Sequence, residues 1–569
     1  MTEWWKKSPR LSGRELTFVA LASLLIAVIQ FWPLVLHLGT DIPLDLGDPL
    51  PQSWQVAWDG YALLHQPLSF FQSNQFWPQP DTLAYSDALI GYTPAGLFGS
   101  GPQAAVARYD LLFLFAFALP FFGAYLLARE LGAPRWAALV AGAAYAYAPW
   151  RMEQGGHLHV ISSGGIPITI ALLLRGYRRE SAGLIFAGWA VATWQLSLGF
   201  SLGLQLLYLL MLLGAVVGIF WWRAGRPLPP RRVVIATLTG CALLAVVGFV
   251  LSRPYLRVLA AHPEAHRSAQ IINYYSPPLR GFIAAPETNL IWGSITEPIR
   301  AGMAAAPEKT LFPGLAILLL VAIGLGWRGY PRGLRIGLLV AAAGSALCSL
   351  GFRQTGIGVY LPYHFLYHFL PGWQGIRVSG RLQTITTLPL ALLAAGGAAR
   401  VAAAAATRWR RESLAATTAA LLTLVVLVEG SGIVYPHPRV PVAPAGLAGL
   451  QPPLLQLPSS PWDNRRYLLW STAGFPPMLN GRTSFEPLFL RHTLRKLDHL
   501  QAPDSIATLR RIGVRTVVID TAESGSEIWT RAALRISASS AFSREWRRPL
   551  LILKLRPLAS KPLGAARQK

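Results

Sequence analysis

Long runs of apolar residues recur along most of the chain, and they constrain its fold more than any other feature of the sequence. The first run, Leu16–Leu36, contains no charged residue. About 20 such residues cross a bilayer as one helix, the form in which a single segment satisfies its own backbone hydrogen bonds. Charged residues make up only 14% of the 569 positions, and the mean hydropathy is +0.39. The chain is therefore predicted to be a polytopic α-helical membrane protein.

About eleven segments of roughly 14–21 residues are predicted to span the membrane. The first is too long for the core of a signal peptide, and no small-residue cleavage site follows it, so we expect an uncleaved span. The predicted spans are Leu16–Leu36, Leu111–Leu127, Trp136–Pro149, Ile161–Leu174, Ala182–Leu198, Leu202–Phe220, Val233–Leu251, Leu311–Leu325, Ile336–Leu350, Leu382–Ala399 and Leu414–Val428.

Short arginine-rich loops alternate with longer, less basic ones. The basic loops are "RELGAPR", "RGYRRES", "RAGRPLPPRR", "WRGYPRGLR" and "TRWRRES". Because Lys and Arg concentrate in short cytoplasmic loops, these loops and the N-terminus are predicted to be cytoplasmic. The same bias accounts for much of the net charge of +25, so no nucleic-acid partner is expected.

The first extracytoplasmic loop, residues 41–110, is far longer than a connection requires, and long loops in compact folds are often functional. It contains "PLPQSWQVAWDGYALLH", which places Trp54, Trp58, Tyr61 and His65 on one stripe of a helix. Trp and Tyr favour the headgroup layer. We therefore expect a helix on the outer membrane surface with Trp54 and Trp58 facing lipid.

The character of the chain changes after the last span. Residues 1–432 form the predicted membrane domain, 433–460 a proline-rich linker, and 461–569 a small soluble α/β domain with "VRTVVID" and "LLILKL" as strands. Eleven spans place this domain outside. Its own basic charge favours the cytoplasm, but large domains are translocated largely regardless of charge, so the short loops decide the orientation.

Four polar clusters are predicted to converge on the outer face. A carboxylate near an apolar boundary has a raised pKa and can accept a proton from a hydroxyl group. Arginine and lysine can hold a phosphate, and histidine can bind phosphate, carry a proton or ligate a metal. The candidates are Asp45 and Asp48; Glu153, His157 and His159; Glu308 and Lys309; and Arg377 and Arg381.

Each cluster also has a structural interpretation. Asp45 and Asp48 are placed as helix N-caps or loop residues, and Glu308 as a cap of the helix that follows it. His157 and His159 have a spacing that occurs in metal sites, but histidines that only form hydrogen bonds in a loop have the same spacing. Arg377 and Arg381 are placed to anchor a span at the headgroups. What favours function is that all four clusters lie on one predicted side.

Several of these stretches together resemble the GT-C superfamily of membrane glycosyltransferases. The nearest likeness is to bacterial YfhO-like and dolichyl-phosphate-mannose-type mannosyltransferase-like proteins, and it covers roughly Leu16 to Ala399. The stretches, in chain order, are "DLGDPLPQSWQVAWDGYALLHQPLSFF", "NQFWPQPDTLAYSDALIG", "MEQGGHLHV", "EKTLFPG" and "PGWQGIRVSGR". Adjacent acidic residues are common in the superfamily, whereas Asp45 and Asp48 are three apart.

The resemblance implies a GT-C-like fold, a catalytic carboxylate in the first outer loop, a polyprenyl-phosphate-linked sugar donor and, in many members, a divalent metal ion. On this basis Asp48 is the favoured base and Asp45 the second. Arg377, Arg381 and Lys309 are expected to hold the donor phosphate. Glu153, His157 and His159 are expected to bind acceptor, phosphate or metal.

The sequence thus predicts a glycosyltransferase of the bacterial cytoplasmic membrane that moves a sugar from a polyprenyl phosphate to a cell-envelope acceptor. The alternative is a non-catalytic membrane protein that binds lipid-linked glycan during envelope assembly. A transporter is disfavoured, because its charged residues would lie within spans, whereas here nearly all lie at span ends.

Overall fold

The computed structural model describes residues 8–225, 229–352, 361–432, 435–497, 500, 502–523, 525–536 and 541–556. Each predicted apolar segment overlaps a helix of the membrane domain. These helices are α2 (Gly13–Gln30), α5 (Gly101–Leu131), α6 (Arg135–Ala146), α9 (Gly165–Arg178), α10 (Ala182–Leu198), α11 (Phe200–Arg223), α12 (Arg231–Ala261), α15 (Leu315–Gly324), α16 (Arg332–Ser349), α18 (Gln383–Arg408) and α19 (Ser413–Gly430).

Shorter helices lie in the connections between these elements and in the C-terminal domain. Those in the connections are α3 (Pro49–His65), α4 (Thr93–Gly96), α7 (Pro149–Glu153), α8 (Leu158–Ile161), α13 (Ala269–Tyr275), α14 (Glu297–Arg300) and α17 (Pro362–Phe369). Those in the C-terminal domain are α20 (Asp463–Ser471), α21 (Leu488–Lys496), α22 (Pro503–Ile512) and α23 (Ser526–Ile536).

The chain is a multi-pass membrane protein. Within the described ranges, eight helices are long and apolar enough to cross a bilayer, with α8 and α9 taken together as one of them. Helices α10 and α15 are apolar but shorter, and α6 has only 12 residues. The predicted number of eleven spans is therefore not confirmed, although the positions of the helices are.

The middle of the bundle is built from small residues. Helix α6 packs against α5, α18 and α19, and nine of its residues are buried, six of them alanine. Gly142 permits a close approach, because a Cβ at this position would lie 2.9 Å from the ring of Phe121. Small side chains let helix backbones approach closely within a membrane, where packing drives association. They account for a short helix being held deep in the bundle.

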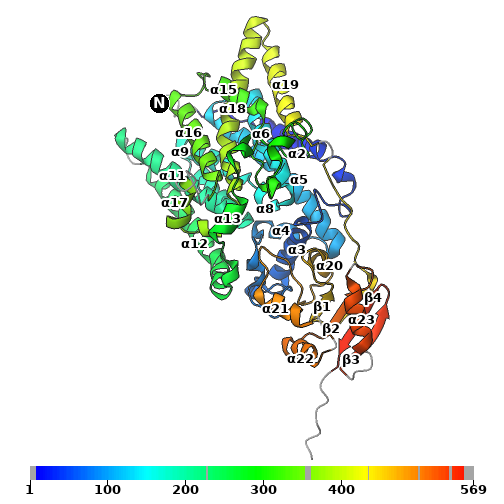
Figure 1. Ribbon diagram of the computed structural model, residues 1–569. Helices are drawn as coiled ribbons and strands as arrows, with labels where there is room; N and C mark the ends of the chain where they lie inside the picture. Colours follow the sequence, from blue (N-terminus) through cyan, green and yellow to red (C-terminus); the bar gives the residue numbers. More distant parts are fainter. Residues whose placement is uncertain are drawn as a thin grey trace, which may run out of the picture.

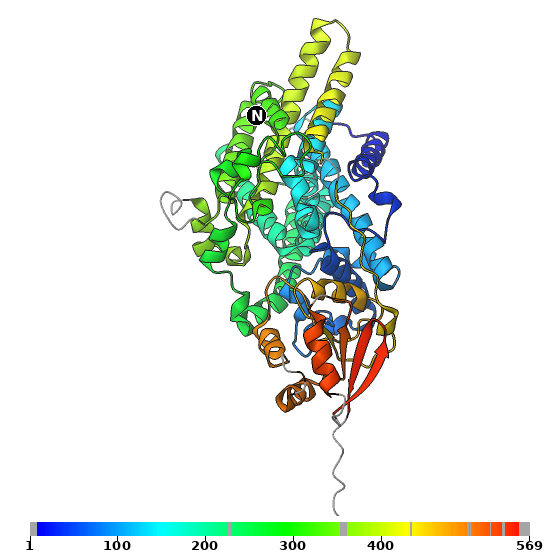
Figure 2. The same ribbon diagram turned by 45° about the vertical axis from the view of Figure 1, so that its right-hand side comes forward.

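Ion pairs between two of the basic loops, and a hydrogen bond to the N-terminal segment, connect these parts at one end of the bundle. Glu130 is buried and pairs with Arg175 at 2.9 Å and Arg178 at 3.0 Å. Arg175 also donates to the carbonyl oxygen of Pro9. The tip of the α18–α19 hairpin and the four strands lie at opposite ends of the molecule (Figures 1 and 2).

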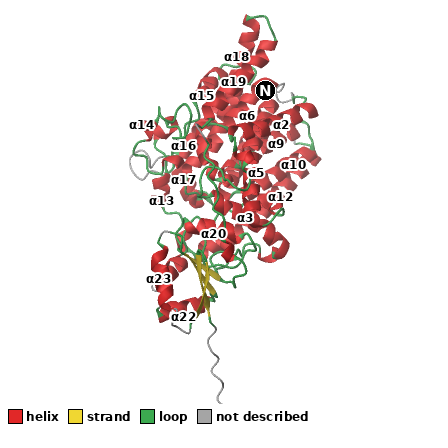
Figure 3. Cartoon of the chain, turned by 90° about the vertical axis from the view of Figure 1, so that its right-hand side faces the viewer, coloured by secondary structure: helices red, strands yellow, loops and turns green. Residues whose placement is uncertain are grey.

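The C-terminal domain contains one four-stranded sheet in the order β1-β2-β4-β3. Strands β1 and β2 are parallel, and the other two pairs are antiparallel. Figure 3 shows α20 between this sheet and the helical bundle. The strands are β1 (Leu454–Leu457), β2 (Thr516–Asp520), β3 (Phe542–Arg547) and β4 (Leu550–Leu555).

The predicted start of this domain at residue 461 is too late. Strand β1 lies inside the segment predicted to be a linker, and its four residues are all buried. Proline at residues 452, 453 and 458 gave the segment the composition of a linker, but the apolar run between these prolines pairs with β2. The last predicted residues of the domain, 557–569, lie outside the described residues.

The predicted first outer loop packs directly against the C-terminal domain. The backbone N–H groups of Phe76 and Trp77 donate to the carbonyl oxygens of Asn480 and Met478, at 3.1 and 2.9 Å. Phe76, Ala84 and Tyr85 belong to the same buried cluster as the strands. Helix α20 packs against α3. The start of α3 therefore meets the C-terminal domain as well as the membrane domain.

The predicted helix in the first loop is present as α3, but its orientation differs from the prediction. Trp54 and Trp58 are each only 2% exposed, so the prediction that they face lipid is wrong. Trp54 Nε1 donates to Asn74 Oδ1, and Trp58 Nε1 donates to the carbonyl oxygen of Phe70. The remainder of the loop and α20 cover the aromatic stripe, and a buried indole N–H takes a partner from the protein.

Candidate functional site

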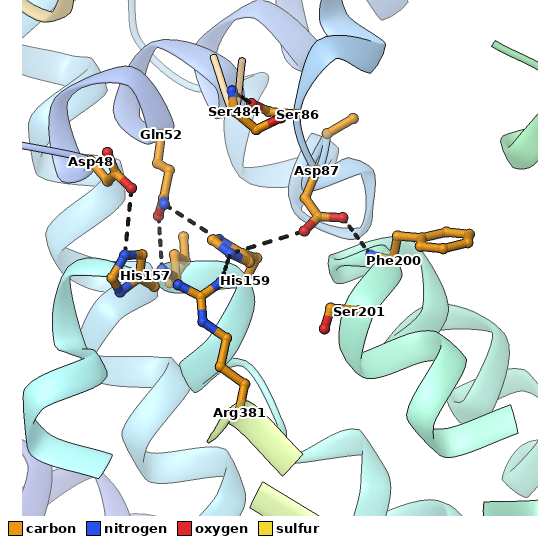
Figure 4. A network of polar contacts seen from close by, with 12 residues as sticks. Asp48, Gln52, Ser86, Asp87, His157, His159, Phe200, Ser201, Arg381 and Ser484 are labelled. Carbon is orange, nitrogen blue, oxygen red and sulfur yellow. Dashed lines mark hydrogen bonds and ion pairs between the residues drawn. The ribbon is translucent and has the colours of Figure 1, made fainter. Parts of the chain in front are cut away.

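A cavity of about 510 Å³ lies between the predicted first outer loop, the loop before α18 and the C-terminal domain. Figure 4 shows the polar network on one of its walls. The sequence-predicted residues that line the cavity are Asp48, Trp54, His157, His159, Arg377 and Arg381. Three of the four predicted polar clusters therefore meet at one place through their side chains.

The start of α3 carries two residues of the network. Asp48 precedes Pro49, the first residue of the helix, and makes no capping bond to the helix. Gln52 lies one turn further on, and its Oε1 accepts a 2.8 Å hydrogen bond from the backbone N–H of Leu158. Residues four apart on a helix share a face. The first turn of α3 is thereby held against the turn that contains the two histidines.

The histidine turn depends on two glycines that precede it. A Cβ at Gly155 would lie 1.8 Å from the hydroxyl oxygen of Tyr435, and one at Gly156 would lie 2.9 Å from Leu44. The turn therefore packs against both segments more closely than a larger residue allows. His157 and His159 follow with ring centroids 5.8 Å apart and planes at 85°.

Arg381 connects three parts of the site. Its guanidinium bonds to Glu308 at 2.6 Å and 3.3 Å, and both side chains are nearly buried. Its Nη1 also lies 3.2 Å from Nε2 of His159. Because arginine can only donate, this nitrogen of His159 must accept, and the ring is neutral. Burial opposes the ionisation of Glu308, but the charge of Arg381 outweighs it and holds the pKa of Glu308 below its ordinary value.

Asp48 lies between a histidine and an arginine. Its Oδ2 lies 3.5 Å from Nε2 of His157, and its Oδ1 lies 3.7 Å from Nη2 of Arg465. Burial acts to raise the pKa of Asp48, but the hydrogen bond from His157 and the charges of His157 and Arg465 hold it well below its ordinary value. The expectation of a raised pKa is therefore wrong for Asp48, and its carboxylate is ionised at neutral pH.

Asp87 is the second carboxylate on the cavity wall. Its Oδ1 accepts a 2.7 Å hydrogen bond from the N–H of Phe200, at the start of α11, and its Oδ2 lies 4.0 Å from His159. Burial raises the pKa of Asp87 above its ordinary value, against the hydrogen bond from Phe200 and the charges of Arg381 and Arg267. The two carboxylates of the cavity are thus placed in different electrostatic environments.

Besides Trp58 and Glu308, three predicted residues do not line this cavity. Asp45 is exposed and accepts the N–H of Gly47 at 2.7 Å, as the first residue of a turn. The ammonium group of Lys309 lies 5.3 Å from the ring centroid of Tyr274. The pKa of Glu153 is raised to about 7 by burial and by the charge of Glu287.

The cavity and its network include functional candidates that the sequence did not single out. Gln52 lay in the predicted helix of the first loop without an assigned role, whereas Glu308 belonged to a predicted polar cluster but was given no role in the site. Asp87 stands in "YSDALIG", a stretch that carried the resemblance, but nothing local marked it. The residues missed as site candidates are Gln52, Asp87, Arg267, Arg465 and Arg482.

The donor set does not fit the divalent metal that the resemblance implied. Within the described ranges, no group of three or more histidine, cysteine, aspartate or glutamate side chains is arranged to hold a metal ion. The nitrogen of His159 that faces the network is occupied by the guanidinium of Arg381, which would repel a cation. We therefore derive no chemical step through a metal.

A second cavity, of about 670 Å³, adjoins the first. It lies among α10, α11 and α12, so it is at the depth of membrane-spanning helices, and most of its wall is apolar. Phe200, Ser252 and Tyr255 line both cavities. The apolar wall includes Leu196, Leu204, Leu207, Met211, Leu244 and Phe249. We call this cavity the apolar groove.

Comparison with solved structures identifies the fold. The arabinofuranosyltransferase AftD from Mycobacteria, determined by cryo-EM as the mutant R1389S, superposes with a TM-score of 0.56 at 18% identity. The match covers 96% of this chain and 42% of AftD, so the chain spans less than half of that protein's length. AftD has the GT-C fold, and the fold expected from the sequence is confirmed.

Two further solved structures match less closely, and no argument rests on them. One is the apo oligosaccharyltransferase of Archaeoglobus fulgidus, with a TM-score of 0.41, 12% identity and 89% and 69% coverage of this chain and that one. The other is apo ArnT from Cupriavidus metallidurans, with a TM-score of 0.32, 12% identity and 94% and 97% coverage. No family model and no curated protein sequence matches the chain.

Proposed function

We propose that this chain, a multi-pass membrane protein with the GT-C fold, is a glycosyltransferase that moves a sugar from a polyprenyl-phosphate donor to an extracytoplasmic cell-envelope acceptor. The observation that carries the proposal is the continuity between the apolar groove and the polar cavity, which share Phe200, Ser252 and Tyr255. A ligand with a long apolar tail and a charged, sugar-bearing head matches the two cavities, because its tail suits the apolar groove and its head suits the polar cavity.

The tail of the donor would lie in the apolar groove. Burial of its methyl and methylene groups against leucine, methionine and phenylalanine side chains supplies binding energy in proportion to the apolar area covered. The groove lies among helices that cross the membrane, so a lipid can enter it from the bilayer. Its shared wall with the cavity would then bring the phosphate to the polar network.

The phosphate of the donor would be held by Arg377 and Arg381. Arg377 lies 4.9 Å over the ring of Tyr275, which orients its guanidinium. Arg381 is held by Glu308 and His159. Positive charge fixed before the reaction stabilises the negative charge that develops on the leaving phosphate in the transition state. These two residues would therefore accelerate cleavage of the bond between the sugar and the phosphate.

Asp48 would receive the proton of the acceptor. The acceptor hydroxyl oxygen forms a bond to the anomeric carbon, the bond from that carbon to the phosphate oxygen breaks, and polyprenyl phosphate leaves. A glycosyl transition state has oxocarbenium character, so the hydroxyl becomes acidic only as the new bond forms. The carboxylate then has to be ionised and well placed more than strongly basic, and the low pKa of Asp48 is compatible with this role.

Filling the apolar groove tests the donor assignment. Gly214 lines the groove, and a Cβ at this position meets no atom within 4 Å. We expect Gly214→Trp to raise the KM for a long-chain polyprenyl-phosphate sugar about tenfold or more, and to change the KM for a short-chain analogue much less. Gly218→Trp is the matched control, because Gly218 lies one turn further along α11, is equally open and is outside the groove. Equal effects of both variants on both donors would contradict the assignment.

We also propose that the chain lies in the bacterial cytoplasmic membrane with its N-terminus in the cytoplasm and its C-terminal domain outside. Ser69 lies exposed in the first outer loop, and Arg410 lies exposed at the α18–α19 tip. In a protein without Cys241 and Cys348, a membrane-impermeant maleimide should label Ser69→Cys in intact cells and Arg410→Cys only after permeabilisation. The reverse pattern would place the site in the cytoplasm and contradict this orientation.

A further inference from the structure

Two arginines of the C-terminal domain, one beside Asp48 and one on the wall of the polar cavity, are not used by the proposed donor site. The first is Arg465 of α20, whose side chain is 9% exposed. Its guanidinium lies 4.3 Å over the ring of Trp462, and its Nη1 donates to the carbonyl oxygen of Pro461 at 3.2 Å. Its Nη2 is 3.7 Å from Asp48, and its buried Nε has no hydrogen-bond partner among the described residues.

The second is Arg482, which lines the polar cavity. It is half-buried, and no carboxylate in the described part of the chain forms an ion pair with its guanidinium. Its backbone N–H donates to Oε1 of Gln75, another cavity residue, at 3.1 Å. It is close enough to Arg465 for the two positive charges to interact, and this repulsion lowers the pKa of Arg465 in addition to the effect of burial.

The loop that presents Arg482 is fixed on both sides. Asn480 is fully buried and bonds to Gln456 through both ends of its amide and to Asn464 through Nδ2. Gly481 packs so closely on Phe76 that a Cβ would lie 2.6 Å from the ring. The backbone that carries Arg482 is therefore held in place before an anion binds, which lowers the conformational entropy lost on binding.

These two arginines are separate from the pair assigned to the donor phosphate. Arg377 and Arg381 follow α17 in the membrane domain and contact Tyr275, Glu308 and His159. Asp48 touches His157 of the membrane domain with one carboxylate oxygen and Arg465 of the C-terminal domain with the other. The base of the proposed reaction thus lies where the two positive regions meet.

We infer that Arg465 and Arg482 form a subsite for an oxyanion on the acceptor, so that the acceptor is an acidic glycan. The oxyanion is a carboxylate of a uronic acid or a phosphate ester, since the planar fork of arginine matches both. This inference rests on the proposed function, because it assigns the acceptor side of the same site. Asp48 pairs with only one of the two guanidinium groups, so a positive charge remains for the acceptor to neutralise.

Binding of small glycosides tests the subsite without requiring turnover. The full-length protein is placed in nanodiscs of phosphatidylcholine, and ligand binding is measured by saturation-transfer NMR. The probes are methyl β-D-glucuronide, methyl β-D-glucoside 6-phosphate and the neutral methyl β-D-glucoside. We expect at least one anionic glycoside to bind roughly tenfold or more tightly than the neutral one, as expected for a charged hydrogen-bonded pair. Which of the two anions is preferred identifies the source of the oxyanion.

Substitutions locate the preference. Arg482→Gln should abolish it, and Arg482→Lys should keep part of it, because the charge remains while the fork is lost. Arg491→Gln is the matched control, since Arg491 is an exposed arginine of the same domain that pairs with Glu486 outside the cavity. Thermal unfolding of each variant checks that the domain remains folded.

The inference is overturned if the three glycosides bind equally to the wild type, or if the preference survives Arg482→Gln and is lost in Arg377→Gln. The outcome for the proposed function is distinguishable. A wild-type preference for the anionic glycoside, without transfer from any polyprenyl-phosphate sugar, would retain the subsite and reject the transferase. Transfer to neutral acceptors, without any preference for the anionic glycosides, would retain the transferase and reject the subsite.

Discussion

Replacing Asp48 by asparagine should lower the rate of sugar transfer by about 10²–10⁴-fold, the usual contribution of a positioned general base. The amide has nearly the shape of the carboxylate but cannot take the proton of the acceptor hydroxyl. The kcat should fall, and binding of the polyprenyl-phosphate donor should change little, because the donor is assigned to Arg377, Arg381 and the apolar groove. Transfer of radiolabelled sugar by purified protein in nanodiscs measures kcat, and a binding assay with the polyprenyl-phosphate donor measures its affinity.

Asp45→Asn is the matched control for this experiment. Asp45 is three residues away, exposed and outside the cavity, so its variant should retain most of the transfer rate. Full activity in an Asp45→Asn, Asp48→Asn double variant would refute the mechanism. If the wild type binds the donor without any turnover, and the variants bind it equally well, the chain is instead a binding protein for lipid-linked glycan.

The helical part of the fold was predictable because an apolar run long enough to cross a membrane indicates a helix by itself. All eleven predicted segments overlap helices, and the boundaries of Ala182–Leu198 agree to the residue. What length alone does not determine is whether a helix crosses the bilayer. Helix α6 is surrounded by α5, α18 and α19, so it is as apolar as a spanning helix without having the length of one.

The orientation of α3 was not predictable from its own sequence. A stripe of tryptophan and tyrosine is typical of the headgroup layer and equally of a buried protein interface, because both surround an aromatic ring with apolar contacts and offer its polar atom a partner. The contacts that α3 makes with Asn74, Phe70 and the distant helix α20 decide that its aromatic residues lie in a buried protein interface. Contacts made by remote segments leave no local signal in the helix itself.

The candidate site likewise contains residues that could be predicted from the local sequence and residues that could not. Asp48, His157, His159, Arg377 and Arg381 were predicted because polar residues at the ends of apolar segments are conspicuous. Arg465 lies more than 400 positions from Asp48 and in another domain, and only the fold brings it to 3.7 Å. The low pKa of Asp48 has the same origin, because cations contributed by other segments oppose the effect of burial on its carboxylate.

Arg381→Gln should impair both catalysis and folding, and a second substitution should separate the two effects. Loss of a preorganised charge on the leaving phosphate is expected to lower kcat by roughly 10²–10³-fold. The substitution also leaves Glu308 nearly buried and without its partner. Breaking a buried pair on one side typically costs about 3–5 kcal/mol, which should appear as a lower thermal unfolding temperature.

The double variant Arg381→Gln, Glu308→Gln removes the uncompensated charge but does not restore the cation. It should therefore recover most of the stability while its transfer rate remains low, a non-additivity expected for two residues in contact. Arg381→Lys keeps the charge but loses the fork that bonds twice to Glu308, so it should lie between the wild type and Arg381→Gln in both measurements. Recovery of transfer together with stability in the double variant would mean that Arg381 acts only by supporting the fold, and the donor phosphate would then have to be assigned to Arg377 without it.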